Sequence, residues 1–145
     1  MKHFGIALMF SLAVALSGCG GGSSSSSAIN GNWTATLTGS QDLSFNVTLT
    51  QSGGVVSVTN LSFTTSQSCF DTGATATGAF TLMGTLNGVT TGSFQMTIQS
   101  AASNANGSNT LVLTGTLTNN SIAGNWTLSG SGLDCTGSGT FTMAD

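Results

Sequence analysis

The chain has 145 residues, a formal net charge of −3 and only 3% charged residues. Its single Lys or Arg is Lys2 and its single histidine is His3, so the rest of the chain has no basic side chain. DNA and RNA binding depends on Lys and Arg side chains that neutralise phosphates, which excludes nucleic acid as a partner. The same absence excludes electrostatic attraction to an anionic membrane surface.

The low charge does not indicate a membrane-spanning or low-complexity chain. After residue 18 no apolar run approaches the ~20 residues that a spanning helix needs. The apolar residues alternate instead with Thr, Ser, Asn and Gln. We therefore expect one folded domain whose polar surface consists of hydroxyl and amide groups.

Residues 1–18 have the composition of a secretory signal peptide. Lys2 and His3 form a short basic start, an apolar stretch follows from Phe4 to Leu16, and the last residues are small. The apolar stretch is too short for a stable transmembrane span, so we expect export of the chain and removal of this segment.

The sequence Leu16-Ser17-Gly18-Cys19 resembles the lipobox of bacterial lipoproteins. The resemblance implies that the Cys19 thiol is acylated with diacylglycerol, that the signal is cleaved just before it, and that the new amine is acylated too. The membrane is then a partner through this lipid anchor. The alternative is an ordinary signal peptide that is cut near Ala28.

Residues 19–28 join this anchor to the rest of the chain. The segment 20–27 reads GGGSSSSS, and an eight-residue Gly/Ser coil has a root-mean-square span of about 15 Å. We interpret it as a flexible tether between the lipidated cysteine and a domain over residues 29–145. In such lipoproteins of diderm bacteria an Asp after the cysteine often signals retention in the inner membrane, so Gly20 favours the outer membrane.

From residue 29 onward the sequence predicts an all-β domain. Apolar and polar residues alternate with a period of two, which is the pattern of strands, and the frequent Thr is β-branched and favours them. Asn87-Gly88 is a strong signal for a two-residue hairpin turn, Asn119-Asn120 is a weaker one, and 52–54 (Ser-Gly-Gly) is a third short turn. We predict eight strands, at 31–38, 43–51, 55–64, 76–86, 89–99, 109–118, 121–130 and 137–144.

A short motif recurs in five of these strands: Gly, any residue, an aromatic residue, any residue, and a small or aliphatic residue. We interpret it as one type of strand, in which the aromatic side chain points inward and the Gly two residues earlier makes room on the same face. The alternative is the compositional bias of a Gly- and Thr-rich β protein. The copies are GNWTA at 31–35, GAFTL at 78–82, GSFQM at 92–96, GNWTL at 124–128 and GTFTM at 139–143.

An up-and-down order sorts the connections between two ends of the domain. The three tight turns and both termini of the domain fall at one end, and four longer connections, at 39–42, 65–75, 100–108 and 131–136, fall at the other. Long strands without Lys or Pro cannot protect exposed edges in the usual way, and a closed barrel removes the edges.

We therefore predict an eight-stranded antiparallel up-and-down barrel, with a two-sheet β-sandwich as the alternative. Eight strands leave an interior that side chains just fill or that holds one small ligand. The aromatic residues expected inside are Trp33, Phe45, Phe63, Phe80, Phe94, Trp126 and Phe141.

The Gly31-Asn32-Trp33 sequence at the start of the first strand resembles lipocalins and avidin-like barrels, whose first strand carries such a G-x-W motif. The resemblance implies the architecture only. Lipocalins typically back this Trp with a late Arg, and the biotin pockets of the avidin family use a Tyr, whereas the domain has neither.

Cys69 and Cys135 fall in longer connections at the same end of the predicted barrel. An exported chain is oxidised, so the two cysteines that remain after lipidation of Cys19 are expected to form a disulfide. Two free thiols and a metal site are the alternatives, and the metal site is disfavoured because the domain has no His.

The sequence offers little for catalysis. General acid–base catalysis and nucleophile activation draw mainly on His, Glu, Lys or Asp, and after Cys19 only Asp is present. Asp42, Asp71 and Asp134 fall in the longer connections, where they are candidates for a ligand site or a weak Ca²⁺ site, or else are solvated loop residues. We assign no catalytic residue, no cofactor and no other metal site.

We therefore expect a lipid-anchored, non-enzymatic β-barrel lipoprotein at the cell envelope, on the periplasmic face of the outer membrane or at the cell surface. Its role is structural or depends on an envelope protein as partner. The alternative is a lipocalin-like carrier of a small apolar ligand, which would bind at the open end of the barrel.

Overall fold

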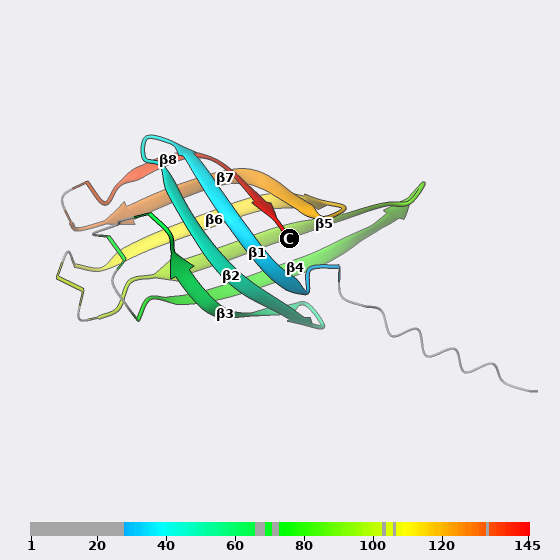
Figure 1. The fold of residues 1–145 in the computed structure, drawn as a ribbon, viewed down its shortest axis with the longest axis horizontal. Helices are drawn as coiled ribbons and strands as arrows, with labels where there is room; N and C mark the ends of the chain where they lie inside the picture. The colour runs from blue at the N-terminus through cyan, green and yellow to red at the C-terminus, as the bar shows by residue number, and fades with distance from the viewer. Residues whose placement is uncertain (1–27, 66–68, 71–72, 103, 106, 133) are drawn as a thin grey trace, which may run out of the picture.

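The computed structural model describes residues 28–145, except 66–68, 71–72, 103, 106 and 133. Eight strands close into one antiparallel barrel in chain order, and β1 pairs with both β2 and β8 (Figure 1). The predicted up-and-down barrel is confirmed and is compatible with a lipocalin-like architecture, whereas the alternative β-sandwich is wrong. The strands are β1 Gly31–Gly39, β2 Leu43–Ser52, β3 Val55–Phe63, β4 Thr75–Leu86, β5 Val89–Gln99, β6 Asn109–Thr118, β7 Ser121–Gly130 and β8 Gly137–Ala144.

The strand boundaries lie within one residue of the predicted ranges, because turn residues mark them in the sequence. Asn87 and Gly88 have φ angles of 52° and 81°, in the left-handed region that a two-residue hairpin turn requires and that Asn and Gly tolerate. Gly53 has a φ of 62° between β2 and β3, and Asn119 has a φ of 55° between β6 and β7.

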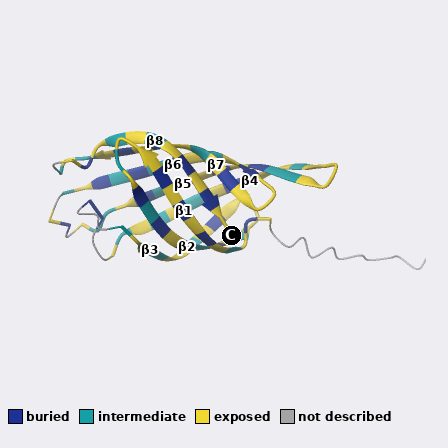
Figure 2. Cartoon of the chain, turned by 45° about the horizontal axis from the view of Figure 1, so that its top comes forward, coloured by how far each residue is buried: buried dark blue, intermediate teal, exposed yellow. Residues whose placement is uncertain are grey.

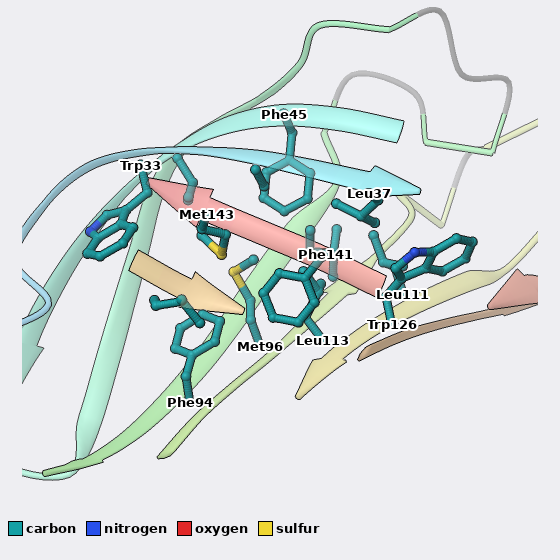
Figure 3. Close-up of a cluster of buried hydrophobic side chains, with 14 of the residues drawn as sticks. Trp33, Leu37, Phe45, Phe94, Met96, Leu111, Leu113, Trp126, Phe141 and Met143 are labelled. Atoms are coloured by element: carbon teal, nitrogen blue, oxygen red, sulfur yellow. The ribbon is translucent and has the colours of Figure 1, made fainter. Parts of the chain in front are cut away.

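The core lies inside the barrel and consists of alternate side chains from the strands, which gives the banded burial of Figure 2. Met96, Phe141 and Met143 lie between the indole rings of Trp33 and Trp126 (Figure 3). Removal of these apolar side chains from water is the main contribution to the stability of the fold, at about 25 cal/mol per Å² of buried apolar surface. Six of the seven aromatic residues expected inside are buried: Trp33, Phe45, Phe80, Phe94, Trp126 and Phe141.

The two tryptophans of the recurring motif also donate hydrogen bonds from the interior. The Nε1–H group of Trp33 donates to the carbonyl oxygen of Ile29 at 3.0 Å, and that of Trp126 donates to the carbonyl oxygen of Thr38 at 3.1 Å. A buried donor without a partner costs about 1–3 kcal/mol, so these bonds favour the observed ring positions. Because Ile29 is itself fully buried, the Trp33 bond ties the segment before β1 to the barrel.

Gly92 shows how a glycine of the motif makes room for an aromatic ring. A Cβ atom at this position would lie 2.3 Å from Cζ of Phe80 and 2.9 Å from the carbonyl oxygen of Thr81. Gly92 pairs with Leu82 and Phe94 pairs with Phe80 across β4 and β5. The space at Gly92 therefore serves the ring of Phe80 on the neighbouring strand.

The third strand departs from the predicted regularity. The register between β2 and β3 shifts between Asn46 and Thr48, and Asn60 on β3 has a φ of 53°, as expected of an extra, bulged residue. Phe63, which was expected inside, is only half-buried. After Val56 no further residue of β3 pairs with β4 among the described residues, so this junction is the shortest of the barrel.

The two ends of the barrel differ as predicted. The near end carries the three tight turns, the first described residue, Ala28, and the end of β8, and the far end carries the four longer connections. Both cysteines of the domain are thus at the far end. Within the part of the chain that the structure describes, no helix is long and apolar enough to cross a membrane.

We predict that Gly92→Ala lowers the free energy of unfolding by about 1–3 kcal/mol, the usual cost of overpacking a well-packed core. Gly54→Ala is the matched control, because a Cβ at Gly54 meets nothing within 4 Å and its φ is not positive. It should change stability by less than about 1 kcal/mol. Chemical denaturation of the two variants measures the difference, and equal midpoints would contradict the steric role of Gly92.

Candidate functional site

The far end is held by the predicted disulfide. Cys69, in the connection between β3 and β4, is bonded to Cys135, between β7 and β8, with 5.5 Å between the two Cα atoms. Both cysteines are buried. The alternatives of free thiols or a cysteine metal site are therefore wrong.

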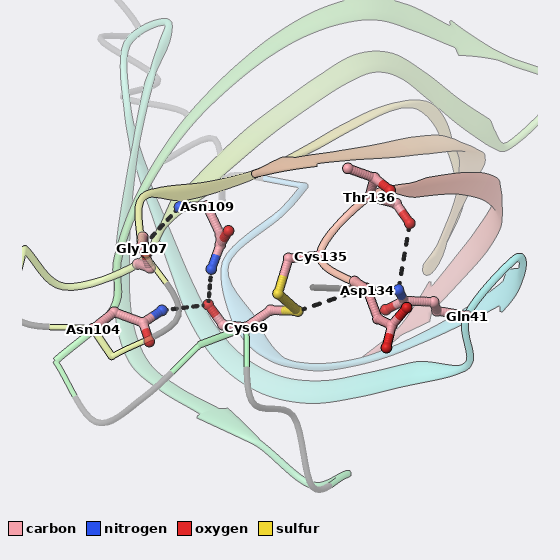
Figure 4. The surroundings of a disulfide bond; sticks show 9 residues. Gln41, Cys69, Asn104, Gly107, Asn109, Asp134, Cys135 and Thr136 are labelled. Carbon is pink, nitrogen blue, oxygen red and sulfur yellow. Dashed lines mark hydrogen bonds between the residues drawn. A yellow bond between two sulfur atoms is a disulfide. The ribbon is translucent and has the colours of Figure 1, made fainter. Parts of the chain in front are cut away.

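A hydrogen-bond network surrounds this disulfide (Figure 4). The carbonyl oxygen of Cys69 accepts bonds from Nδ2 of Asn104 at 2.6 Å and from Nδ2 of Asn109 at 2.9 Å. Both asparagines are buried, and buried amides need such partners. These bonds tie the connection between β5 and β6 to the disulfide.

Gln41 joins the remaining connection to the same network. Its Nε2 donates to the carbonyl oxygens of Asp134 and of Thr136, the latter at 3.3 Å. Sγ of Cys69 lies 3.9 Å from the Asp134 carbonyl oxygen. This contact is not a hydrogen bond, because the sulfur is in a disulfide and has no proton to donate. All four connections at the far end are thus linked by covalent or hydrogen bonds.

The aspartates proposed as a ligand or ion site are only partly described. Asp42 and Asp134 are exposed at the far end, and Asp71 lies outside the described residues. Asp134 takes part in the network through its carbonyl oxygen and has a φ of 64°. Among the described residues no three His, Cys, Asp or Glu side chains form a group that could hold a metal ion. An ion site that includes Asp71 stays a prediction.

Phe70 is a core residue of the far end that the sequence analysis missed. It is buried, and its ring stacks on that of Phe63 with centroids 5.0 Å apart and an interplanar angle of 7°. Phe63 in turn contacts Phe45 with centroids 5.5 Å apart. Because Phe70 lies in a connection and not in a strand, strand periodicity could not place it; its position beside Cys69 was the only signal.

The near end carries an unexpected apolar surface. The tip of the β4–β5 hairpin, which we call the apolar tip, exposes Leu82, Met83, Leu86 and Val89, and Leu86 is 77% exposed. The sequence contains one signal for it. Leu82 and Met83 are consecutive apolar residues just before Gly84, which interrupts the alternation of a strand that faces the core.

The apolar tip extends beyond the rest of the barrel wall, as Figures 1 and 2 show. The register of β4 and β5 shifts between Leu82 and Gly84, which makes Met83 a bulged residue. The last pair between β5 and β6 is Thr91 with Thr118. Beyond it, Asn119 receives a bond from the Thr90 N–H on its Oδ1 at 3.2 Å and donates its own N–H to the Thr90 carbonyl oxygen at 2.8 Å.

The proposed lipidation site Cys19, the tether 20–27 and the signal peptide 1–18 lie outside the described residues. The structure therefore bears on them only through the position of Ala28 at the near end. No protein family model matches the chain, no curated protein is significantly similar to it, and no solved structure matches it.

We predict that Cys69→Ser combined with Cys135→Ser lowers the free energy of unfolding by about 2–5 kcal/mol, because a disulfide limits the freedom of the unfolded chain. The cysteines are 66 residues apart, so the closed loop is long. Denaturation with and without a reducing agent measures the effect. Reduction should destabilise the wild type and leave the double variant unchanged, and a wild type unaffected by complete reduction would contradict a stabilising disulfide.

Proposed function

We propose that this chain is an exported lipoprotein of the cell envelope, anchored by fatty acyl chains on Cys19, with a structural or protein-interaction role. One observation carries the proposal. The barrel pairs Cys69 with Cys135, which leaves Cys19, in Leu16-Ser17-Gly18-Cys19, as the only cysteine of the chain without a disulfide partner inside the domain.

The disulfide supports export, since such bonds persist in oxidising compartments and are rare in the cytosol. The tether supports anchoring. One acyl chain holds a protein at a membrane only marginally, and two or more hold it stably, so an acylated thiol and amine on Cys19 would retain the domain. Gly20 favours the outer membrane as the location.

We propose a non-catalytic role because the domain has few groups that can transfer protons. The sequence after Cys19 contains no His, Lys, Arg, Glu or Tyr, and Asp42 and Asp134 are exposed at the far end. General acid–base groups work best when burial or neighbours adjust them to the reaction. A partner protein would instead meet a surface of hydroxyl and amide groups.

The anchor is tested by replacing its cysteine. We expect Cys19→Ser to lose incorporation of a palmitate analogue in cells and to leave the membrane fraction, or to keep its signal peptide uncleaved. The double variant Cys69→Ser, Cys135→Ser is the matched control and should remain labelled, because its Cys19 is intact. A wild-type protein with an unmodified Cys19, or one cut near Ala28, would refute the proposal.

The carrier of a small apolar ligand is the second candidate, favoured by the short β3–β4 junction as a point of entry. The rings of Trp33, Phe45 and Phe141 in the interior argue against it (Figure 3). We expect native mass spectrometry of the protein purified from a bacterial envelope to show the same mass for the domain before and after denaturation. A small molecule lost on denaturation would instead make the carrier the better assignment.

A further inference from the structure

The exposed apolar residues of the domain are gathered at one end. Every large hydrophobic side chain that is exposed among the described residues lies near the near end, and Met83 is 71% exposed. Four of these residues form the apolar tip. The fifth is Val55, the first residue of β3, which pairs with Ala79, a residue of β4 that precedes the tip. Scattered single apolar residues need no explanation, but a contiguous apolar patch marks an interaction site.

The two strands of the hairpin that carries the apolar tip lose their neighbours at different points. On the β5 side, Asn119 still bonds to Thr90, which pairs with Thr85. On the β4 side, the last bond to the barrel is from the N–H of Phe80 to the carbonyl oxygen of Gly54, at 3.3 Å. The six residues from Thr81 to Leu86 then extend about 20 Å along the strand, at roughly 3.3 Å per residue. Beyond Thr85 and Thr90 only residues 86–89 project without a strand neighbour on either side among the described residues, and the apolar side chains exposed there favour a partner.

We infer that the apolar tip docks into the interface of a lipid bilayer, an inference that rests on the proposed Cys19 anchor. The chain enters the barrel at the near end, the same end as the tip (Figure 1). Between Cys19 and Ala28 lie eight residues, whose expected span is about 15 Å. An anchored domain therefore holds its near end within reach of the membrane.

The chemistry of the tip fits an uncharged or zwitterionic lipid surface. The hairpin from Thr75 to Gln99 contains no ionisable side chain, and the carboxylates of Asp42 and Asp134 are at the opposite end of the barrel. Among the described residues Asp145, which follows β8, is the carboxylate side chain at the near end. The sequence after Cys19 has no basic side chain that would favour anionic lipids.

The backbone limits how deep the tip can go. The outer edges of a two-stranded hairpin have backbone N–H and C=O groups without strand partners, and hydrocarbon cannot satisfy them. The hydroxyl groups of Thr85 and Thr90 also lie at the tip, 3.2 Å apart. The tip therefore belongs at the boundary between headgroups and acyl chains, with Leu86 and Val89, which flank the turn, as the deepest side chains.

The test uses the full chain, purified from cells as the processed protein and placed in phosphatidylcholine vesicles, with Leu86→Trp as a fluorescent probe. The native Trp33 and Trp126 are buried in the core, so the wild type supplies a constant background. Ala102→Trp is the matched control, because Ala102 is exposed at the far end. Mass spectrometry of the same samples reports whether Cys19 is acylated.

We expect phosphatidylcholine brominated near the headgroup to quench the Leu86→Trp emission about twofold, with weaker quenching by bromine deep in the chains and none of the Ala102→Trp emission. Acylated, vesicle-bound protein without Leu86→Trp quenching would overturn the docking of the tip and leave the anchor intact. An unmodified Cys19 would refute the anchor, and the inference with it. A blue shift of Leu86→Trp without vesicles that grows with protein concentration would overturn it in favour of a second copy.

Discussion

Closure of the sheet is the constraint on which the rest of the structure depends. β1 pairs with β8 from Thr34–Ala144 to Gly39–Gly139, which gives the first and last strands a neighbour on both sides. An open sheet of these sequences would expose two edges, and the chain has no Lys or Pro after residue 2 with which to protect them. The same closure creates the enclosed interior that buries the aromatic side chains.

On the outer wall of the barrel, hydrogen bonds between uncharged side chains link neighbouring strands. Oγ1 of Thr34 donates to Oδ1 of Asn46 at 3.0 Å, and Oγ1 of Thr48 donates to Oδ1 of Asn32 at 2.7 Å. Nδ2 of Asn60 reaches the same Thr48 hydroxyl at 3.2 Å. Cross-strand pairs of this kind contribute about 0.2–1 kcal/mol each, and unlike ion pairs they are not screened by salt.

The two ends of the barrel have opposite characters that follow from the same topology. Four long connections meet at the far end, where the Cys69–Cys135 bond, Asn104, Asn109 and Gln41 cross-link them. Tight turns meet at the near end, where Asn119 contacts Thr90 of the longest hairpin and Phe80 donates its N–H to the carbonyl oxygen of Gly54. One end is therefore cross-linked and polar, and the other presents an apolar hairpin tip at the end where the chain enters.

The sequence by itself determined the strands, their order and the disulfide. Alternating residues such as those of β2 face opposite sides of a sheet, and Asn87 and Gly88 accept positive φ. Cys69 and Cys135 are the two cysteines of the domain, so their pairing needs no knowledge of the tertiary structure. Only the tertiary structure decided the rest. Phe63 pairs with the buried Phe45 and packs against the core, but it is only half-buried because no described residue of β3 after Val56 has a strand partner on β4. The exposure of Leu82, Met83 and Leu86 depends on how far β4 and β5 extend past their neighbours, because an apolar residue is buried only where another strand or the core covers it.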